Sequence, residues 1–214
     1  MGARLRHARV VRGITLRSMA RRVGVSPSLI SQVETGRANP SVSTLYALVN
    51  ELGVSLDELL FTDARLPDPG ADDDGPAPEN GVELLADTLP RWPVQGSQGR
   101  PSIRLASGVQ WERLTTESLQ HVDFLFVTYE VGGASSPSDA FQRHAGFEFG
   151  YILSGELRLN IGFEEYLLKA GDAITFDAST PHRLSNAGET SVTAVWFVVG
   201  RRGASAGQES RSPG

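Results

Sequence analysis

The sequence predicts a multidomain α + β protein, with a helical domain at the N-terminus and an all-β domain at the C-terminus. Apolar residues up to Leu60 repeat with helical spacing, whereas from about Ser102 they alternate with polar residues. A stretch rich in proline and aspartate separates the two patterns. We therefore divide the 214 residues into a helical domain over 1–62, a linker over 63–101, a β domain over 102–199 and a tail over 200–214.

Residue types that cap helices mark the helix boundaries of the first domain. Thr15 and Ser26 are N-cap types, whose side-chain oxygens accept hydrogen bonds from the free backbone amides of a first turn. Gly24 and Gly53 suit helix ends, and Pro27 suits a first helical turn. Because apolar sets with i, i+3, i+4 spacing lie between these signals, we expect a bundle of about five short helices.

The linker and the tail have compositions that do not favour a packed core. Residues 63–101 hold seven of the twelve prolines and an acidic run at Asp72–Asp74. The tail after Gly200 is rich in glycine, serine and charged residues. Such segments bury too little apolar surface to offset the entropy lost on ordering. We expect an extended linker and a disordered tail.

Strand signals dominate the C-terminal domain. Residues 156–161 alternate strictly between polar and apolar side chains, and residues 121–127 and 192–199 are rich in β-branched and aromatic residues. Turn signals recur at short intervals between them, as at Gly132–Gly133 and Gly171–Asp172. Many short strands without a helical pattern between them predict an all-β sandwich or barrel.

The composition excludes several classes of site and location. The chain has no cysteine, which excludes disulfides, zinc–thiolate sites and cysteine nucleophiles. It has no apolar run long enough to span a bilayer, and its arginine-rich N-terminus lacks the apolar region of a secretory signal. We therefore expect a cytoplasmic protein with no membrane contact.

Charge is distributed unevenly along the chain. The net charge is −5, but residues 1–62 carry eight arginines against four carboxylates, which gives +4 for this domain and leaves −9 for the remainder. A basic domain on an acidic body is the pattern expected of a chain that binds a polyanion through one end. The helical domain is therefore the candidate nucleic-acid binder.

Residues 16–36 predict two short helices joined by a tight turn at Gly24, which is the geometry of a helix-turn-helix. With the segment Glu34-Thr-Gly-Arg-Ala-Asn-Pro40, residues 4–61 resemble the phage-repressor-type helix-turn-helix domain of the xenobiotic-response-element (XRE) family. The resemblance implies sequence-specific binding of double-stranded DNA. It also implies that the helix from about Pro27 to Glu34 enters the major groove as the recognition helix.

The resemblance implies roles in DNA binding for seven residues. Phosphate contacts position such a domain, whereas base contacts read the sequence. Gln32 is the strongest candidate for base contact, because a glutamine amide pairs bidentately with adenine N6 and N7, and the alternative is a solvated polar side chain. The resemblance further implies that Glu34 pairs with Arg9 inside the fold. The base-facing candidates are Pro27, Ser28 and Gln32, Ser31 is a candidate for either a base or a phosphate, and the phosphate candidates are Arg17, Arg37 and Asn39.

Two motifs in the β domain resemble those of the cupin family, and the match extends over roughly residues 103–199. The first is His144-Ala-Gly-Phe-Glu148 followed by six residues and Gly155, and the second is Pro181-His182 followed by Asn186. The resemblance implies a double-stranded β-helix barrel. A repressor-like head followed by a cupin resembles the XRE-family regulators with a C-terminal cupin sensor. This implies a ligand-responsive transcriptional regulator, a homodimer through the cupin, with a small-molecule effector in the barrel and a pseudo-palindromic operator.

Four polar residues of the cupin motifs are candidates for a metal or effector site. Gln142, His144 and Glu148 are spaced to share one face of a strand, and His182 on a later strand can meet them inside the barrel. Two imidazoles and a carboxylate form the facial triad of Fe(II) sites, and the set also suits Mn, Ni or Zn. The family pattern usually has a histidine where Gln142 stands; an amide oxygen is a weaker ligand, so a three-ligand site is better supported than a four-ligand one. The alternative is that both histidines are polar lining of an organic-ligand pocket.

An enzyme is the second hypothesis for the same residues. Non-haem Fe(II) oxygenases use this triad, and hydroxypropylphosphonate epoxidase resembles the chain in joining a repressor-like head to a cupin. The head nevertheless keeps its arginines and the Ser/Gln face of its recognition helix, which an oxygenase does not need. A storage or scaffold cupin would leave the basic head unexplained. The sequence therefore favours a regulator over both.

Overall fold

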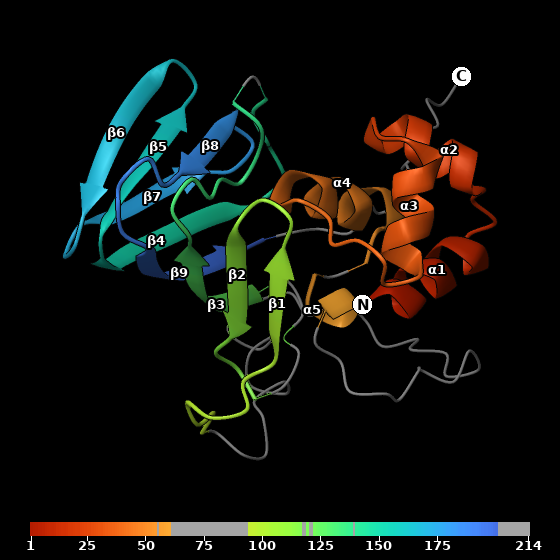
Figure 1. Cartoon of the computed structure of the whole chain (residues 1–214), viewed down its shortest axis with the longest axis horizontal. Coiled ribbons are helices and arrows are strands. Elements are labelled where there is room, and N and C mark those ends of the chain that lie inside the picture. The colour runs from red at the N-terminus through yellow and green to blue at the C-terminus, as the bar shows by residue number, and fades with distance from the viewer. Residues whose placement is uncertain (55, 61–93, 117–118, 120–121, 139, 201–214) are drawn as a thin grey trace, which may run out of the picture.

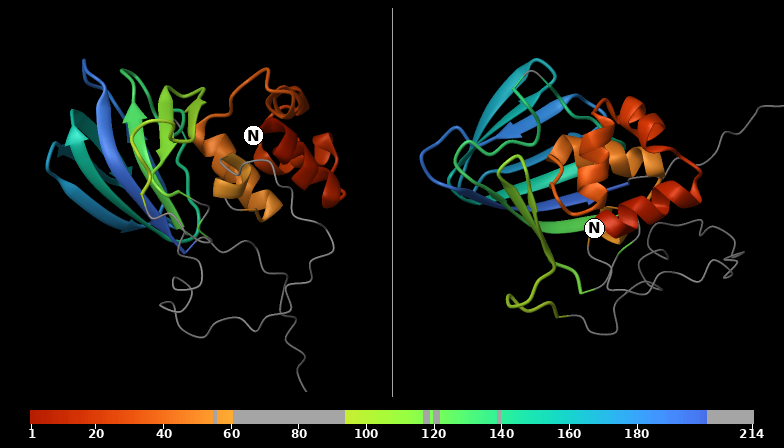
Figure 2. Two further views of the ribbon diagram at one scale, coloured as in Figure 1. Left: turned by 90° about the horizontal axis from the view of Figure 1, so that it is seen from below. Right: turned by 45° about the vertical axis from the view of Figure 1, so that its right-hand side comes forward.

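The computed structural model describes residues 1–54, 56–60, 94–116, 119, 122–138 and 140–200. The helices gather on one side of the molecule and the sheets on the other (Figures 1 and 2). Residues 63–93 of the predicted linker and 201–214 of the predicted tail lie outside the described residues. No helix in the described part is long and apolar enough to cross a membrane.

Four helices of eight residues or more and one five-residue helix make up the described N-terminal domain. The side chain of Thr15 accepts a hydrogen bond from Ser18 N where the second helix starts, and that of Ser26 accepts one from Leu29 N where the third starts. Gly24 ends the second helix with φ 75°, a left-handed conformation that glycine adopts without steric cost. The predicted helix-turn-helix is confirmed. The helices are α1 (Gly2–Val11), α2 (Leu16–Val23), α3 (Pro27–Glu34), α4 (Val42–Leu52) and α5 (Leu56–Leu60).

A buried ion pair holds the first helix against the third. Arg9 of α1 donates from Nε to Glu34 Oε1 over 2.6 Å and from Nη2 to Glu34 Oε2 over 2.9 Å. Its Nη1 donates to the carbonyl oxygen of Ile14 over 2.7 Å, so the guanidinium is bonded on three sides. The pairing of Arg9 with Glu34 is thus confirmed, and Glu34 does not face the outer surface of the recognition helix.

The strands form two antiparallel sheets, which confirms the predicted β class of the C-terminal domain. One sheet has the strand order β1-β2-β3-β9-β4-β7 and the other the order β6-β5-β8. Strand pairing among the described residues does not join these sheets into one closed barrel. Two predicted strands, 156–161 and 192–199, match β5 and β9 residue for residue. The strands are β1 (Ser102–Leu105), β2 (Val109–Arg113), β3 (Val122–Tyr129), β4 (Phe147–Ser154), β5 (Glu156–Ile161), β6 (Glu164–Lys169), β7 (Ala173–Asp177), β8 (His182–Ser185) and β9 (Val192–Val199).

The period of two along β4 decides which of its residues face the interior. Glu148, Gly150 and Ile152 are buried, whereas the residues between them are exposed. The exposed positions form an apolar row on the outer face of the six-stranded sheet, made up of Phe147, Phe149, Tyr151 and Leu153. Aromatic residues on the same strand therefore contribute to the surface and not to an internal cavity.

Helix α4 joins the helical domain to the β domain. Ser43 N donates to the carbonyl oxygen of Ser135 over 2.9 Å, and Ala106 N donates to that of Pro40 over 3.0 Å. The ring of Tyr46, which is buried, lies 5.7 Å from the ring of Trp111 on β2. In Figures 1 and 2, α4 is the long helix that runs closest to the sheets. The two domains are therefore in direct contact through α4 and the residue Pro40 just before it.

Candidate functional site

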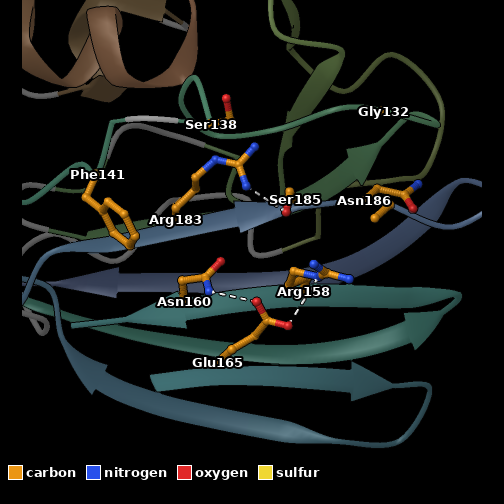
Figure 3. Close-up of a pocket in the computed structure, with 10 residues that line it drawn as sticks. Gly132, Ser138, Phe141, Arg158, Asn160, Glu165, Arg183, Ser185 and Asn186 are labelled. Carbon is orange, nitrogen blue, oxygen red and sulfur yellow. Dashed lines mark hydrogen bonds and ion pairs between the residues drawn. The ribbon is translucent and has the colours of Figure 1, made fainter. Parts of the chain in front are cut away.

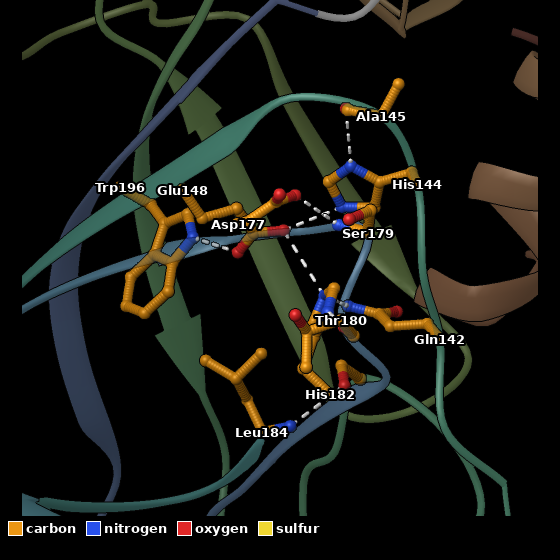
Figure 4. A network of polar contacts seen from close by, with 11 residues as sticks. Gln142, His144, Ala145, Glu148, Asp177, Ser179, Thr180, His182, Leu184 and Trp196 are labelled. Carbon is orange, nitrogen blue, oxygen red and sulfur yellow. Dashed lines mark hydrogen bonds and ion pairs between the residues drawn. The ribbon is translucent and has the colours of Figure 1, made fainter. Parts of the chain in front are cut away.

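Two histidines and a glutamate meet in the interior of the β domain (Figure 4). His144 precedes β4, Glu148 lies on β4 and His182 begins β8, and all three are buried. Glu148 Oε1 lies 2.6 Å from His144 Nε2 and 3.4 Å from His182 Nε2. One ligand atom from each residue can be chosen so that all lie within 4.8 Å of one another.

Backbone carbonyls set the orientation of both imidazoles. His144 Nδ1 lies 3.2 Å from the carbonyl oxygen of Ala145, and His182 Nδ1 lies 2.9 Å from that of Thr180. A carbonyl oxygen only accepts, so Nδ1 carries the proton in each ring. Nε2 of each ring then faces Glu148, which is the arrangement typical of metal-binding histidines.

Glu148 is fixed from its other side by an indole. Trp196 Nε1 on β9 donates to Glu148 Oε2 over 2.6 Å, so Oε1 is turned toward the histidines. Burial raises the pKa of the Glu148 carboxyl, but the imidazoles of His144 and His182 outweigh burial and hold that pKa well below its usual range. The carboxylate is therefore the charged form in the folded protein near neutral pH.

The prediction that Gln142, His144 and Glu148 share one face of a strand is wrong, because the three residues do not lie on one strand. β4 begins only at Phe147, and the chain before it bends at Gly146, where φ is 106° and a Cβ would overlap the carbonyl oxygen of Val199. Strand periodicity does not extend across such a bend. The side chains nevertheless converge, because separate backbone bonds anchor His144 to Ala178 and Gln142 to His182.

Gln142 lies at the edge of the cluster with its amide beside His182. Its Nε2 lies 3.2 Å from His182 Nε2, and its Oε1 is buried without a hydrogen-bond partner among the described residues. A half-turn of the Gln142 side-chain amide exchanges its oxygen and nitrogen, and would turn Oε1 instead of Nε2 toward His182. Gln142 is thus adjacent to the three-residue cluster.

The donor set fits a divalent metal ion. His144 Nε2 and Glu148 Oε1 approach closely without hydrogen-bond geometry, and both lack a hydrogen-bond partner in the described structure. Buried polar atoms rarely lack a hydrogen-bond partner in folded proteins. Two imidazole nitrogens and one carboxylate oxygen are donors that Fe, Mn, Ni and Zn all accept. The cluster is therefore compatible with a metal site.

Aromatic rings surround the cluster, and one of them comes from the helical domain. Tyr46 stacks on His144 with ring centroids 4.5 Å apart and an angle of 24° between the rings. Phe176 packs edge-on against His182, and burial together with the charge of Glu148 raises the pKa of Tyr129 well above its usual range. Tyr46 is not among the residues that the sequence predicts for this site. One signal in the sequence could have indicated that Tyr46 faces a different neighbour. It lies outside the apolar set of the same helix, which is made up of Leu45, Leu48, Val49 and Leu52.

The second cupin motif ends in a residue that shapes the backbone. The Nδ2 of Asn186 donates to the carbonyl oxygens of Tyr129, Glu130 and Thr190, and its Oδ1 accepts from Gly188 N. The side chain is buried and ties the segment after β8 to the end of β3. Asn186 therefore supports the fold.

An open hollow lies on the outer side of the three-stranded sheet (Figure 3). Glu165 accepts from Asn160 Nδ2 over 3.1 Å and pairs with Arg158 at 3.6 Å, and Arg183 donates to Ser185 Oγ over 3.0 Å. Residues of β5 alternate, so Arg158 and Asn160 face away from the buried Leu157 and Leu159. The hollow is thus separate from the histidine cluster on the inner side.

The recognition helix presents its candidate DNA contacts to the outside. Of the seven predicted residues, Ser31 is half-buried and the other six are exposed, namely Arg17, Pro27, Ser28, Gln32, Arg37 and Asn39. Ile30 and Val33 of the same helix are buried in the domain core. The outward face of α3 is therefore polar and accessible, as a major-groove helix requires.

Comparisons with known proteins match both domains. Residues 5–59 match the helix-turn-helix family and residues 125–199 the cupin domain family. The HTH-type transcriptional regulator PuuR of Escherichia coli (strain K12) is 30% identical over 185 residues, which cover 86% of either chain. An HTH_3 family transcriptional regulator from Vibrio cholerae shares the fold, with TM-score 0.59, 16% identity and coverage of 94% of this chain and 95% of that one. Hydroxypropylphosphonic acid epoxidase from S. wedmorenis aligns with TM-score 0.41 and 22% identity over 92% of this chain and 95% of its own, a likeness too distant to bear on function.

Proposed function

Because this chain belongs to the XRE-type helix-turn-helix transcriptional regulators with a C-terminal cupin domain, we propose that it is a ligand-responsive regulator that binds a pseudo-palindromic operator. The observation that carries the proposal is that one chain joins an exposed polar recognition helix to a buried His–Glu–His cluster. The helix serves DNA, and the cluster serves a small effector. The proposed site of action is the cytoplasm.

DNA contact is proposed at the exposed face of α3 and around it. Ser28 and Gln32 face base edges together with Pro27, while Ser31 contacts either a base or a phosphate. Phosphates are bound by Arg17 of α2 and by Arg37 and Asn39 in the segment after α3, all three of which are exposed. The exposure of these side chains and the net charge of +4 over residues 1–62, from eight arginines and four carboxylates, support this assignment.

A homodimer is proposed through the outer face of the six-stranded sheet. The row Phe147, Phe149, Tyr151 and Leu153 is 40% or more exposed at every position, and Phe197 of β9 packs beside Phe149 on that face. A contiguous apolar strand face of this kind marks an interaction site, and a two-fold copy of the chain offers the same surface in return. Two heads would then read half-sites about 34–36 Å apart or a multiple of that distance.

We propose that the two sheets of the cupin domain form a double-stranded β-helix and that the histidine cluster inside it is the effector site. His144, Glu148 and His182 would hold a divalent ion such as Fe, Mn, Ni or Zn, with Gln142 beside them. A metal held by three protein ligands keeps open positions for donor atoms of a small molecule. The unpaired buried atoms of the cluster support this role. The domain division at 1–62, 63–101, 102–199 and 200–214 is part of the same proposal.

An Fe(II)-dependent oxygenase or epoxidase of the hydroxypropylphosphonate epoxidase type is the second candidate. The observation that favours it is the same triad of two histidines and one glutamate. The curated relatives are named as transcriptional regulators, which favours a protein without catalytic activity. Oxygen uptake by protein loaded with Fe(II), measured across phosphonate and amine substrates, tests this candidate, and no uptake is expected.

Fluorescence anisotropy tests the proposed regulator directly. The purified chain is titrated onto the DNA upstream of its own coding sequence and onto a scrambled control at two salt concentrations. We expect tighter binding to the upstream DNA and a steep loss of affinity with salt, because phosphate contacts release counterions. Equal weak binding to both DNAs, together with substrate-dependent oxygen uptake, would favour the oxygenase.

A further inference from the structure

We propose that Tyr46 of the DNA-binding domain forms a wall of the cupin site, so that occupancy of the site fixes the position of helix α4. This inference rests on the proposed role of His144, Glu148 and His182 as the metal and effector site. It adds a residue from the other domain to that site. It also gives the site a physical route to the recognition helix.

The contact between Tyr46 and His144 is a closely packed ring stack. The centroids are 4.5 Å apart, the rings are inclined by 24°, and 5% of the surface of either residue is exposed. The ring of Trp111 lies 5.7 Å from the ring of Tyr46 and is inclined to it by 56°. His144 is therefore bounded by Glu148 at its Nε2 edge and by Tyr46 at its face. Binding of an ion at His144 Nε2 therefore acts on a ring that Tyr46 of the helical domain contacts.

Backbone bonds tie the start of α4 to the strand that carries the second histidine. Ser43 N donates to the carbonyl oxygen of Ser135, and Ser135 N donates in turn to that of Leu184 over 2.9 Å. Ser135 Oγ also accepts from Leu184 N over 3.0 Å. Leu184 follows His182 by two residues on β8. Helix α4 is thus linked to both histidines, by a ring stack to one and by the backbone to the other.

The opposite face of α4 belongs to the core of the DNA-binding domain. Leu48 and Leu52 point away from Tyr46 by helical spacing and are fully buried, and α4 packs on α2, which packs on α3. A cation at His144 Nε2 withdraws electron density from the imidazole. The stack on the electron-rich phenol ring is then strengthened by about two- to thirtyfold, the range of cation–π contacts. Metal loading therefore favours the docked position of α4, and with it one placement of the recognition helix.

Cobalt(II) and amide hydrogen exchange test the coupling without an operator. Wild type, Tyr46→Leu and Tyr46→Phe are loaded with Co²⁺, whose visible absorption reports binding, and exchange in α4 is followed by mass spectrometry. Leu48→Ala is the matched control, because it perturbs the same helix on the face away from His144. In wild type, Tyr46→Phe and Leu48→Ala, we expect Co²⁺ to slow exchange in α4 by about two- to thirtyfold. In Tyr46→Leu, Co²⁺ still binds but exchange in α4 changes less than twofold on loading.

Each outcome of this experiment separates the coupling from the site itself. Equal slowing in wild type and Tyr46→Leu overturns the role of Tyr46, as does a wild type that binds Co²⁺ without slowing α4. If Co²⁺ gives no visible absorption band with wild type, or gives the same band with His144→Ala, the proposed metal site is overturned, and the coupling with it. If His144→Ala shows no Co²⁺ absorption while Tyr46→Leu still shows it, His144 is needed to bind the ion and Tyr46 is needed to transmit its effect to α4.

Discussion

Trp196 donates a 2.6 Å hydrogen bond to Glu148, and its ring lies over the backbone of Gly150. A Cβ at position 150 would overlap the six-membered part of the indole. Glu148 and Gly150 both face the interior from β4, while Trp196 comes from the neighbouring strand β9. The absence of a side chain at position 150 therefore permits the bond that orients the carboxylate.

Gly150→Ala should displace the indole and weaken metal binding. Loss of an outer hydrogen bond to a ligand typically costs about 10- to 100-fold in metal affinity, and we expect a loss of that size in a Co²⁺ titration. Overpacking should also lower the free energy of unfolding by about 1–3 kcal/mol. Gly96→Ala is the control, because a Cβ there meets no atom within 4 Å. Wild-type Co²⁺ affinity in Gly150→Ala would show that the indole does not orient Glu148.

Glu148 should make the stability of the metal-free protein depend on pH in the acid range. Its pKa is held well below the ordinary value of about 4.3, against the effect of burial, by His144 and His182. The folded state thus binds fewer protons at this carboxyl than the unfolded chain. Its stabilisation is fully present above the unfolded pKa and is lost as the pH falls through the folded pKa.

We expect the free energy of unfolding of Glu148→Gln, measured by urea titration, to be lower than wild type at pH 6. Below about pH 4.3 the wild type should lose up to about 1.4 kcal/mol per pH unit more than the variant. Glu165→Gln on the exposed strand β6 removes a carboxylate that contacts neither histidine, so it should keep the wild-type slope. Parallel profiles for wild type and Glu148→Gln would contradict the prediction.

The Arg9–Glu34 pair should matter far more for stability than an exposed pair in the same domain. Arg9→Met leaves the Glu34 carboxylate buried without its partner, which costs about 3–5 kcal/mol in the free energy of unfolding. Arg22 pairs with Glu51 at the surface, where its side chain is 54% exposed, so Arg22→Met should cost less than about 1 kcal/mol. Urea titrations of the two variants should separate them clearly. Similar losses would mean that the Arg9 pair contributes no more than a surface contact.

Local signals predicted the elements of this fold, and non-local packing accounts for what they missed. The capping residues Thr15 and Ser26 and the period of two in β5 act within a few residues, so the bounds of α3 and β5 could be predicted. The bend at Gly146 depends on the carbonyl oxygen of Val199, which lies more than fifty residues away in the chain. It could not be read from the spacing of Gln142, His144 and Glu148.

The three residues of the His–Glu–His cluster were predicted, but the residues that surround them were not. His144, Glu148 and His182 carry a motif, so their convergence followed from resemblance, as did the pairing of Arg9 with Glu34. Tyr46 carries no motif, and its contact with His144 depends on how two domains dock. The way two domains pack together depends on surface residues that show no repeating pattern in the sequence. The contact between Tyr46 and His144 could therefore not be predicted from the sequence.

Gln32 and Arg37 should separate base recognition from phosphate binding. Both side chains are exposed, Gln32 on α3 and Arg37 just after it. Gln32→Ala should lower the affinity for the preferred operator by about 1–3 kcal/mol and relax the preference at one base position, since a base contact discriminates sequence. Arg37→Ala should weaken binding to all sequences alike and reduce the dependence of affinity on salt by about one ion. Anisotropy titrations against an operator series with single base changes, each at two salt concentrations, measure both effects. Equal losses on every sequence for both variants would remove Gln32 as a base contact, because only a residue that contacts a base edge can favour one base over another.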